Sequence, residues 1–380
     1  MSQREVQKPM RTIALEEAFL HPKLFDLYPL ELQQRYGPVK DKLLDVGPER
    51  IKRMDAAGID LQVLSHVAPG IEMLSDTAIA IQLSKEINNW LGDVVQKYPT
   101  RFAGFATLPT QSPKDAADEL ERTVKLFGFK GALINGHTNG RYLDHESFSV
   151  LLHKAEALDV PIYIHPIDPP KEISEMYYRN SATLITGWGF SVDTATHLLR
   201  MIQSGVFDRH PKLRIIIGHM GELIPFCYPR LSLALSMGEW LLSVQESKAT
   251  GSSSINRMEK SFDYYMKENV YVTTSGVFDQ PVFECALAYL GINNLLFSVD
   301  DPFRDNFEAV GFLNTTHLTR EDKEKLAHYN AERLLKLPPA IGSRVDLVRT
   351  PVERLKSSVY AFRAKMKSKM GRMLISFLVK

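Results

Sequence analysis

The sequence predicts a (β/α)8 barrel, in which eight parallel strands alternate with helices. Eight short apolar runs recur along the chain, and they are rich in Ile, Val, Leu and Phe and too short for helices. Longer amphipathic segments separate them, which is typical of repeated strand–helix units. The runs predicted as strands are residues 12–17, 61–66, 102–108, 131–135, 161–165, 214–219, 271–275 and 295–300. Several end in a side chain that can bind a metal or move a proton, and barrels of this class place their active site at the C-terminal ends of the strands.

Helical patterns fill the segments between these runs. The strongest covers residues 76–98, where apolar residues form one broad side. The other predicted helices are residues 48–57, 113–127, 146–158, 192–206, 226–244, 280–290 and 320–337. Residues 21–47 contain several Pro and Gly residues, so they are predicted to be an irregular loop over the barrel mouth. The Gly/Ser-rich residues 249–254 are predicted to be a surface loop between strands six and seven.

The chain divides into a polar segment at 1–10, a barrel domain at 11–337 and a basic tail at 338–380. Its composition, 44% hydrophobic and 24% charged residues, is that of a globular protein. No apolar run approaches the roughly 20 residues that span a bilayer, and the first ten residues lack the apolar core of a signal peptide. Cys227 and Cys285 have no metal-like spacing, so we expect no disulfide framework and a reducing, cytoplasmic setting.

The tail carries most of the charge asymmetry. Residues 344–380 contain ten Lys/Arg and two Asp/Glu, a charge of +8, so the net charge of +1 leaves −7 on the rest. A mildly acidic body argues against nucleic-acid binding, which needs a basic face. From Pro351 onward, apolar residues at spacings of three and four alternate with basic ones, which predicts an amphipathic helix. This helix suits weak contact with an anionic membrane surface, or packing on the barrel or on a second subunit.

The first predicted strand ends in two adjacent carboxylates. Residues 13–18 read IALEEA, and strand alternation puts Glu16 and Ala18 on one face and Glu17 on the other. An inward carboxylate at a strand end can bind a divalent ion. Alternatively, one of the acidic pair accepts a hydrogen bond from a nearby backbone N–H group.

Two histidines follow the fifth and sixth predicted strands. Residues 161–168 read PIYIHPID, and the proline after His165 keeps this histidine extended at the barrel mouth. Residues 214–222 read RIIIGHMGE, so His219 emerges at a strand end and Glu222 can hold one of its ring nitrogens. Imidazole binds Zn²⁺ and transfers protons near neutral pH. Alternatively, His165 is a structural histidine bonded to a loop carbonyl, and Glu222 caps a helix.

An aspartate ends the eighth predicted strand. Residues 295–303 read LLFSVDDPF, and alternation turns Asp301 away from the face that carries Asp300. Asp300 can bind a metal and carry a proton, or it can simply cap the loop. Glu16, His165 and Asp300 together offer oxygen and imidazole ligands, which suit Zn²⁺, Mn²⁺ or Mg²⁺. The sequence contains no Gly-rich phosphate loop and no Gly-x-Ser-x-Gly elbow.

These motifs resemble the decarboxylase branch of the amidohydrolase superfamily, which includes 2,3-dihydroxybenzoate, γ-resorcylate and salicylate decarboxylases. The resemblance covers residues 11–337 and rests on IALEEAF at 13–19, LSxxAPG at 64–70, GFKGAL at 128–133, HP at 165–166, GVFDRHPKL at 205–213, GHMGE at 218–222 and FSVDxPF at 297–303. It implies one divalent metal, with Zn²⁺ favoured, bound by Glu16, His165 and Asp300. It further places His219 and Glu222 beside the metal and Arg230 near the substrate.

The chain departs from the family pattern at three places. Ala18 stands where many superfamily members have the second histidine of a His-x-His pair, although the fungal dihydroxybenzoate decarboxylases also show alanine there. Asp301 replaces a bulky aromatic residue, which is expected to change the charge and shape near the mouth. The basic tail lies outside the family pattern and is compatible with a specialised role in a biosynthetic pathway.

The resemblance implies non-oxidative decarboxylation of a small ortho-hydroxylated aromatic acid of the hydroxybenzoate or orsellinate type, with release of CO₂. Asp300 would protonate the ring carbon that carries the carboxylate, while His219, held by Glu222, assists. The alternatives are metal-dependent hydrolysis of an ester, lactone or amide, and a non-catalytic barrel that acts as a scaffold. The family also implies a homodimer or homotetramer.

Overall fold

The computed structural model describes residues 10–237 and 258–339 of the chain. Its strands form two parallel sheets, of order β1-β2-β3 and β4-β5-β6-β7-β8. Their bounds are β1 (Ile13–Phe19), β2 (Leu61–His66), β3 (Phe102–Gly104), β4 (Ala132–Asn135), β5 (Ile162–His165), β6 (Ile215–Ile217), β7 (Val270–Thr273) and β8 (Leu295–Leu296). Single parallel bridges, Leu15 with Ser298 and Ala106 with Ala132, join the two sheets at both edges. The strands therefore close into one ring, as expected for a (β/α)8 barrel.

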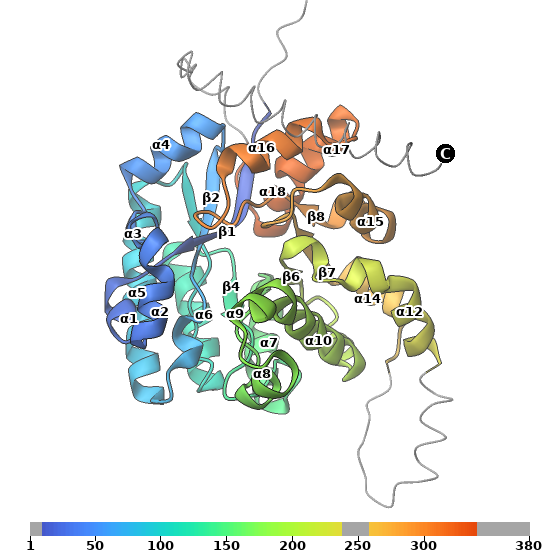
Figure 1. Ribbon diagram of the computed structural model, residues 1–380, viewed down its shortest axis with the longest axis horizontal. Helices are drawn as coiled ribbons and strands as arrows, with labels where there is room; N and C mark the ends of the chain where they lie inside the picture. Colours follow the sequence, from blue (N-terminus) through green and yellow to red (C-terminus); the bar gives the residue numbers. More distant parts are fainter. Residues whose placement is uncertain (1–9, 238–257, 340–380) are drawn as a thin grey trace, which may run out of the picture.

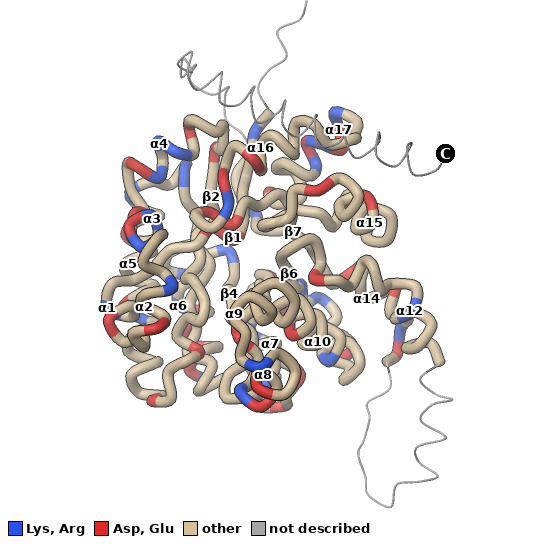
Figure 2. Tube along the Cα trace, viewed as in Figure 1, with Lys and Arg blue, Asp and Glu red and all other residues tan. Residues whose placement is uncertain are grey.

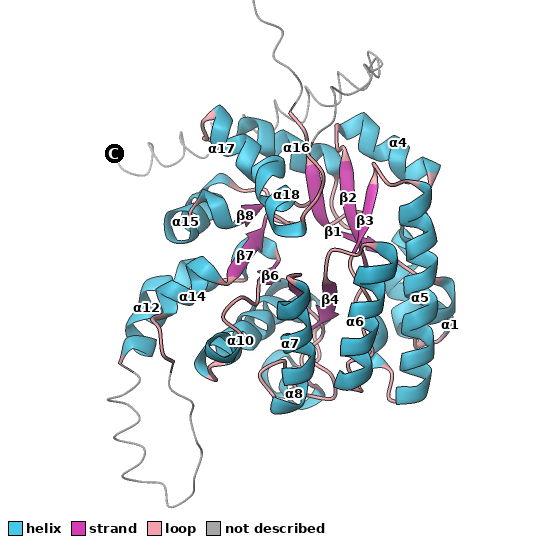
Figure 3. Ribbon diagram, turned by 180° about the vertical axis from the view of Figure 1, so that it is seen from behind, coloured by secondary structure: helices cyan, strands magenta, loops and turns pink. Residues whose placement is uncertain are grey.

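Helices surround the ring of strands, as Figures 1 and 3 show from opposite sides. The helices before β5 are α1 (Pro22–Asp26), α2 (Leu30–Tyr36), α3 (Lys40–Leu44), α4 (Pro48–Ala57), α5 (Thr77–Lys97), α6 (Pro113–Phe127) and α7 (Ser149–Leu158). Those after β5 are α8 (Lys171–Tyr178), α9 (Ala182–Leu184), α10 (Phe190–Gln203), α11 (Val206–Arg209), α12 (Ile224–Ser236), α14 (Phe262–Glu268), α15 (Gln280–Leu290), α16 (Asn306–Thr315), α17 (Arg320–Glu324) and α18 (Asn330–Leu335).

Short 3₁₀ and π turns complete these connections. The 3₁₀ turns are η1 (Gly37–Val39), η2 (Gly70–Met73), η3 (Glu146–Phe148), η5 (His219–Gly221) and η6 (Ile292–Asn294), and the π turns are η4 (Ile185–Gly189) and η7 (Lys325–Tyr329). Within the described residues, no helix is both long and apolar enough to span a membrane. Figure 2 shows Lys and Arg interspersed with Asp and Glu over the outer helices.

The strands are buried on both faces, which explains their continuous apolar runs. One core cluster fills the barrel interior and contains Ile13, Val63, Phe105, Tyr163 and Ile216, with Leu335 of α18. The alternate strand residues, such as Ala14, Ile162 and Ile217, pack outward in a second cluster beneath the helices. This two-layer core fixes the strand ends that carry the polar site.

Among the predicted elements, the helices agree best with the structure. Residues 48–57, 113–127 and 280–290 are helical with the predicted bounds. The prediction of an irregular segment at 21–47 is wrong, because α1, α2 and α3 occupy it. Pro22 lies in the first turn of α1, where its missing N–H group costs no helical hydrogen bond, and Pro29 is the N-cap of α2. The expected loop at 249–254 and the expected tail helix lie outside the described residues, and the predicted division of the chain at 10 and 337 stays a prediction.

Candidate active site

Three of the predicted site residues meet at one end of the barrel. Glu16 Oε1 lies 3.4 Å from His165 Nε2 and 3.5 Å from His219 Nε2. The two imidazole rings stand at 61° with centroids 6.0 Å apart. One ligand atom from each of the three residues lies within 4.8 Å of the others, a spacing that allows one metal ion to reach all three. They come from β1, β5 and the turn after β6, at the C-terminal ends of the strands.

A bulge in β1 turns Glu16 into the barrel. Ala14 pairs with Gln62 and Glu17 with Leu64, so β1 holds one residue more than β2 between these pairs. Glu16 itself has a left-handed φ of 65°, which is rare for a side-chain-bearing residue. Leu15, the residue before Glu16, faces the barrel interior. The extra residue allows Glu16 to face the interior as well. Strict alternation from the start of the strand would have sent Glu16 outward.

The other oxygen of Glu16 is held inside the barrel. Tyr163 of β5 donates its hydroxyl hydrogen to Glu16 Oε2. The backbone of Gly218, the residue before His219, lies very close to the Glu16 carboxylate. A Cβ at this position would lie 2.6 Å from Glu16 Oε2 and 3.1 Å from the Tyr163 hydroxyl. A side chain at 218 would therefore displace the carboxylate, which explains the glycine.

His219 and Glu222 form a tight pair. His219 Nδ1 lies 2.6 Å from Glu222 Oε1, which leaves Nε2 directed toward Glu16. Both residues have left-handed φ angles, 47° and 50°, in the turn that leads into α12. Such conformations cost free energy and persist only where the surrounding structure enforces them, which often happens at functional sites.

Asp300 follows β8 and faces the same cluster. A Cβ on Gly276 would lie 3.3 Å from Asp300 Oδ2 and 3.3 Å from His219 Cδ2, so the two side chains flank this glycine. Asp300 also has a left-handed φ, 76°. Burial raises its pKa to about 7, although the positive charges of His219 and Arg304 oppose the shift. Its carboxyl group can therefore keep a proton near neutral pH.

The charges of the cluster depend on one another. Burial raises the pKa of Glu16 to about 8, against the attraction of His219. Burial, followed by the neighbouring His219, lowers the pKa of His165 to about 3, so His165 is neutral. Burial also disfavours the positive charge on His219. The negative charges of Glu222, Glu16 and Asp300 outweigh this effect and raise the pKa of His219 to about 10. The cluster thus combines one cationic imidazole with three carboxyl groups.

This arrangement fits a divalent metal. Glu16 Oε1 is buried and makes no hydrogen bond among the described residues. Glu16 Oε1 lies between the ring nitrogens of His165 and His219, at 3.4 and 3.5 Å, and a buried oxygen without a bonded donor is costly unless an ion meets it. A neutral imidazole and carboxylate oxygens are also the donor types that divalent first-row metals accept. The residues present therefore meet the requirements of the metal that the sequence predicts.

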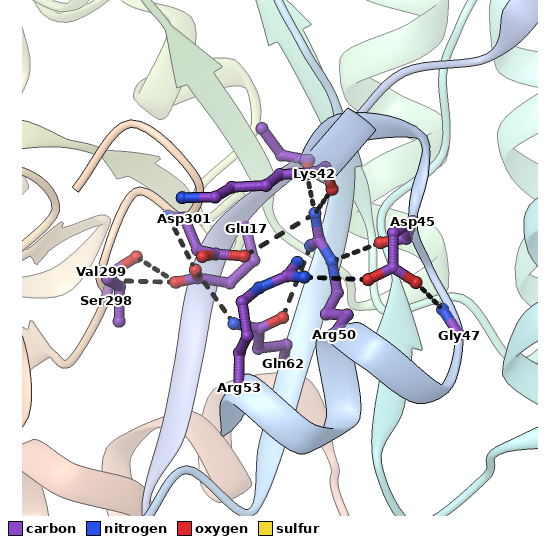
Figure 4. A network of polar contacts seen from close by, with 11 residues as sticks. Glu17, Lys42, Asp45, Gly47, Arg50, Arg53, Gln62, Ser298, Val299 and Asp301 are labelled. Atoms are coloured by element: carbon purple, nitrogen blue, oxygen red, sulfur yellow. Dashed lines mark hydrogen bonds and ion pairs between the residues drawn. The ribbon is translucent and has the colours of Figure 1, made fainter. Parts of the chain in front are cut away.

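Behind the cluster, a second polar network fixes the ends of β1 and β8 (Figure 4). Glu17 accepts hydrogen bonds from the backbone N–H groups of Val299 and Asp301, at 2.9 and 3.0 Å, and from the Ser298 hydroxyl at 3.1 Å. These donors flank Asp300 on both sides. Glu17 is thus the carboxylate that binds nearby backbone N–H groups, while Glu16 faces the cluster.

Arg50 of α4 occupies the centre of this network and is fully buried. Its guanidinium donates to the carbonyl oxygens of Ala18 at 2.6 Å and Asp45 at 2.8 Å. Asp301 Oδ2 lies 3.7 Å from Arg50 Nη2. Asp301 is thus buried and paired with Arg50, but its negative charge still contributes to the raised pKa of Asp300. The expectation that Asp301 changes the charge and shape near the mouth stays a prediction.

Arg230 is not brought into the cluster. It is exposed on α12, and within the described part of the chain no hydrogen bond or ion pair joins it to the other site residues. Sequence reasoning also missed residues that support the site, namely Tyr163, Gly218 and Gly276. The signal for Tyr163 was present, since it stands two residues before His165 and so shares its face.

Comparison with known proteins agrees with this geometry. The profile of the amidohydrolase family matches residues 41–337. A γ-resorcylate decarboxylase from Polaromonas sp. is 35% identical over 332 residues, covering 86% of this chain and 98% of the relative. The solved 5-carboxyvanillate decarboxylase from Novosphingobium aromaticivorans, with bound manganese, is 32% identical, with a TM-score of 0.79 over 87% of this chain and 98% of that one. A dihydroxybenzoic acid decarboxylase from Polaromonas sp., with manganese and the inhibitor 2-nitroresorcinol, is 33% identical, with a TM-score of 0.75 over 87% of this chain and 98% of that one.

Proposed function

This chain belongs to the amidohydrolase family, and we propose that it is a decarboxylase that removes CO₂ from an ortho-hydroxylated aromatic acid without oxidation. The observation that carries this proposal is the cluster of Glu16, His165 and His219, whose ligand atoms lie within 4.8 Å of one another, with the Asp300 carboxyl group beside it. The relatives named above act on hydroxylated benzoic acids, and the match spans nearly their whole length.

The proposed reaction needs one proton at a ring carbon. Asp300 keeps this proton near neutral pH and delivers it to the carbon that bears the carboxylate. The C–C bond then breaks, its electron pair restores the aromatic ring, and CO₂ leaves. Asp300 regains its proton from water before the next turnover.

His219 and Glu222 act as a unit in this scheme. The Glu222 carboxylate holds Nδ1 of the imidazole, so the ring keeps a fixed orientation. In this position the Nε2 side of His219 stabilises the phenolic oxygen of the substrate. Arg230 stays a prediction for the substrate side. Its replacement by alanine is expected to raise KM with little change in kcat.

Glu16 and His165 would hold the single divalent metal. The sequence predicts Asp300 as the third ligand, whereas the structure brings a ring nitrogen of His219 within 4.8 Å of the ligand atoms of Glu16 and His165. The bound metal would act as a Lewis acid and template for the carboxylate and phenolic oxygens of the substrate. The ligand types favour Zn²⁺, whereas manganese in the two solved relatives favours Mn²⁺. Reconstitution of metal-free protein with each metal in turn, followed by the CO₂ assay, identifies the one that supports turnover.

An exposed apolar surface supports self-association. Phe226 and Leu233 lie exposed on the same face of α12 as Arg230, and Met237, the C-cap residue of this helix, is exposed as well. Phe226 is 83% exposed, which is unusual for a phenylalanine on an isolated surface. We therefore propose a homodimer or homotetramer, and light scattering coupled to gel filtration measures its mass.

The first experiment measures CO₂ release across a panel of hydroxybenzoates that includes 2,6-dihydroxybenzoate, salicylate, orsellinate and 6-methylsalicylate. Release that a chelator abolishes and added metal restores is the expected result. Turnover in D₂O is expected to place one deuterium at the ring carbon that lost the carboxylate. Formation of an acid or amine product from an ester, lactone or amide, without CO₂, would overturn the proposal in favour of hydrolysis.

Asp300→Asn tests the assignment of the proton donor. The amide keeps the size of the side chain but cannot deliver the proton, so kcat is expected to fall by about 10²-fold or more. Circular dichroism and Tm are expected to stay close to wild type. A variant that retains activity would exclude Asp300 as the acid.

A further inference from the structure

A second group of metal-binding side chains lies at the other end of β6 from His219. His153 and Glu156 stand about one turn apart on α7 and so share a face of that helix. His210 follows α11 and precedes β6. One ligand atom of each residue lies within 4.8 Å of the other two. Two imidazoles and one carboxylate form a donor set that zinc uses in proteins.

His210 is the buried member of this group. Its residue is only 5% exposed, yet neither ring nitrogen makes a hydrogen bond to any described residue. Its Nδ1 lies 3.5 Å from Glu156 Oε2, and its ring centroid lies 6.2 Å from that of His153. Buried polar atoms are nearly always hydrogen-bonded or bound to an ion. Nδ1 has only the long contact with Glu156, and Nε2 has no partner among the described residues, so this buried ring points to a missing partner.

The backbone around His210 is firmly held. The backbone N–H of Lys212 donates to Glu156 Oε1 at 2.8 Å, which leaves Oε2 facing His210. Asn269 Nδ2 donates to the carbonyl oxygens of Pro211 and Leu213, at 3.1 and 2.9 Å. Two of the three side chains are thus positioned by contacts that do not depend on a metal.

The three ligand atoms must come closer together to bind one ion, and the exposed side chain of His153 has the freedom to make this movement. Zinc bonds of about 2.1 Å in tetrahedral geometry place ligand atoms about 3.4 Å apart. Rotation of the His153 ring about its side-chain bonds brings it closer to the other two. A purely structural role for Glu156, as the acceptor for Lys212 and the partner of His210 Nδ1, explains neither the unbonded Nε2 of His210 nor the proximity of His153.

We propose that His153, Glu156 and His210 bind a second divalent cation of the zinc class, separate from the active site. Three protein ligands leave a fourth position for water. The ion would tie α7 to the segment between α11 and β6. Since this end of the barrel faces away from the catalytic cluster, the bound ion stabilises the fold and takes no part in the chemistry.

The test counts metal ions on the full-length protein. Metal-free protein is dialysed against micromolar free Zn²⁺, and the retained zinc is measured by mass spectrometry of the digested sample. His153→Ala is expected to retain about one equivalent less per chain than wild type. Because His153 is exposed, this variant is expected to fold normally, which circular dichroism checks.

His317→Ala is the matched control. His317 is also exposed, and its Nδ1 lies 3.4 Å from Glu284, but no third ligand completes a group there among the described residues. Its zinc content is expected to equal that of wild type. Equal zinc in wild type and His153→Ala would overturn the proposal, and so would an equal loss in His317→Ala.

Thermal stability gives an independent reading. At the same free Zn²⁺ concentration, Tm is expected to rise more for wild type than for His153→Ala, because only the native site binds the second ion. Equal increases in the two proteins would contradict the proposal. Both measurements count or sense metal rather than turnover, so they stand even if the decarboxylase assignment fails.

Discussion

At the scale of single residues, the site depends on backbone conformations that most side chains avoid. Glu16, His219, Glu222 and Asp300 all have left-handed φ angles. Each such residue costs roughly 1–3 kcal/mol. Four of them at one end of the barrel indicate that packing elsewhere sustains a strained, functional arrangement.

Gly218→Ala tests how closely this arrangement is packed. The added methyl group would lie 2.6 Å from Glu16 Oε2, so the carboxylate must move away from the metal site. We expect a loss of about 10–100-fold in kcat/KM, the range for disturbed support of a metal ligand. Gly187→Ala is the control, because a Cβ there meets no atom within 4 Å. Equal activity of the two variants would show that Glu16 is not constrained by Gly218.

Glu72 provides a pH-dependent prediction. It is buried and accepts a hydrogen bond from the backbone N–H of Asn135 at 2.9 Å, and burial raises its pKa to about 7. Between the unfolded value of 4.5 and about 7, the folded state keeps a proton that the unfolded state loses. Stability therefore falls as pH rises through this window, by up to about 3 kcal/mol for the full shift.

Glu72→Gln removes the ionisation and is expected to abolish this loss. Its amide can also donate to Asn135 Oδ1, which is buried without a hydrogen bond among the described residues. The Tm of the variant is expected to exceed that of wild type at pH 8 by more than at pH 5. Parallel Tm curves across this range would refute the role of Glu72.

At the scale of secondary structure, the sequence predicted the order of strands and helices well because apolar periodicity carries that information. It could not predict the bulge in β1, which moves one residue without altering the apolar pattern. Strands β6 and β8 are also shorter than predicted, so His219 and Asp300 lie in turns after them. Their φ angles and the approach of Gly218 to Glu16 depend on tertiary contacts between distant strands, which a local pattern does not contain.

The buried Arg50 makes α4 a structural anchor for the strand ends. Arg50→Met would leave Asp301 without its ion pair and the carbonyl oxygens of Ala18 and Asp45 without a donor. Breaking a buried pair in this way costs about 3–5 kcal/mol.

Arg53→Met on the same helix is the control. Arg53 pairs with Asp45 at 2.9 Å near the surface, so its loss should cost about 1 kcal/mol or less. Similar urea unfolding midpoints for both variants would exclude Arg50 as an anchor.

At the scale of the whole molecule, the described contacts close the barrel before the basic tail begins. Arg11 donates to Glu332 Oε1 at 2.5 Å and to the Pro338 carbonyl oxygen at 2.7 Å. Leu337 packs into the interior cluster with Leu335. A chain ending at residue 339 keeps all these contacts, and it is expected to retain wild-type Tm and CO₂ release. A chain ending at residue 335 loses Leu337 and the Pro338 acceptor, so its Tm is expected to fall.

The same truncation tests the tail as a membrane contact. Removing residues 340–380 takes away a charge of +8 and leaves −7, since residues 340–343 are uncharged. Basic residues near an anionic surface contribute about 1 kcal/mol each, and salt weakens this attraction. The full-length protein is therefore expected to float with anionic vesicles at low salt, whereas the chain ending at 339 does not. Neutral vesicles serve as the control. If neither form binds anionic vesicles, the membrane contact is excluded, and packing on protein is the remaining role for the basic helix predicted from the sequence. Gel filtration of the two forms would then show whether this segment contributes to a subunit interface.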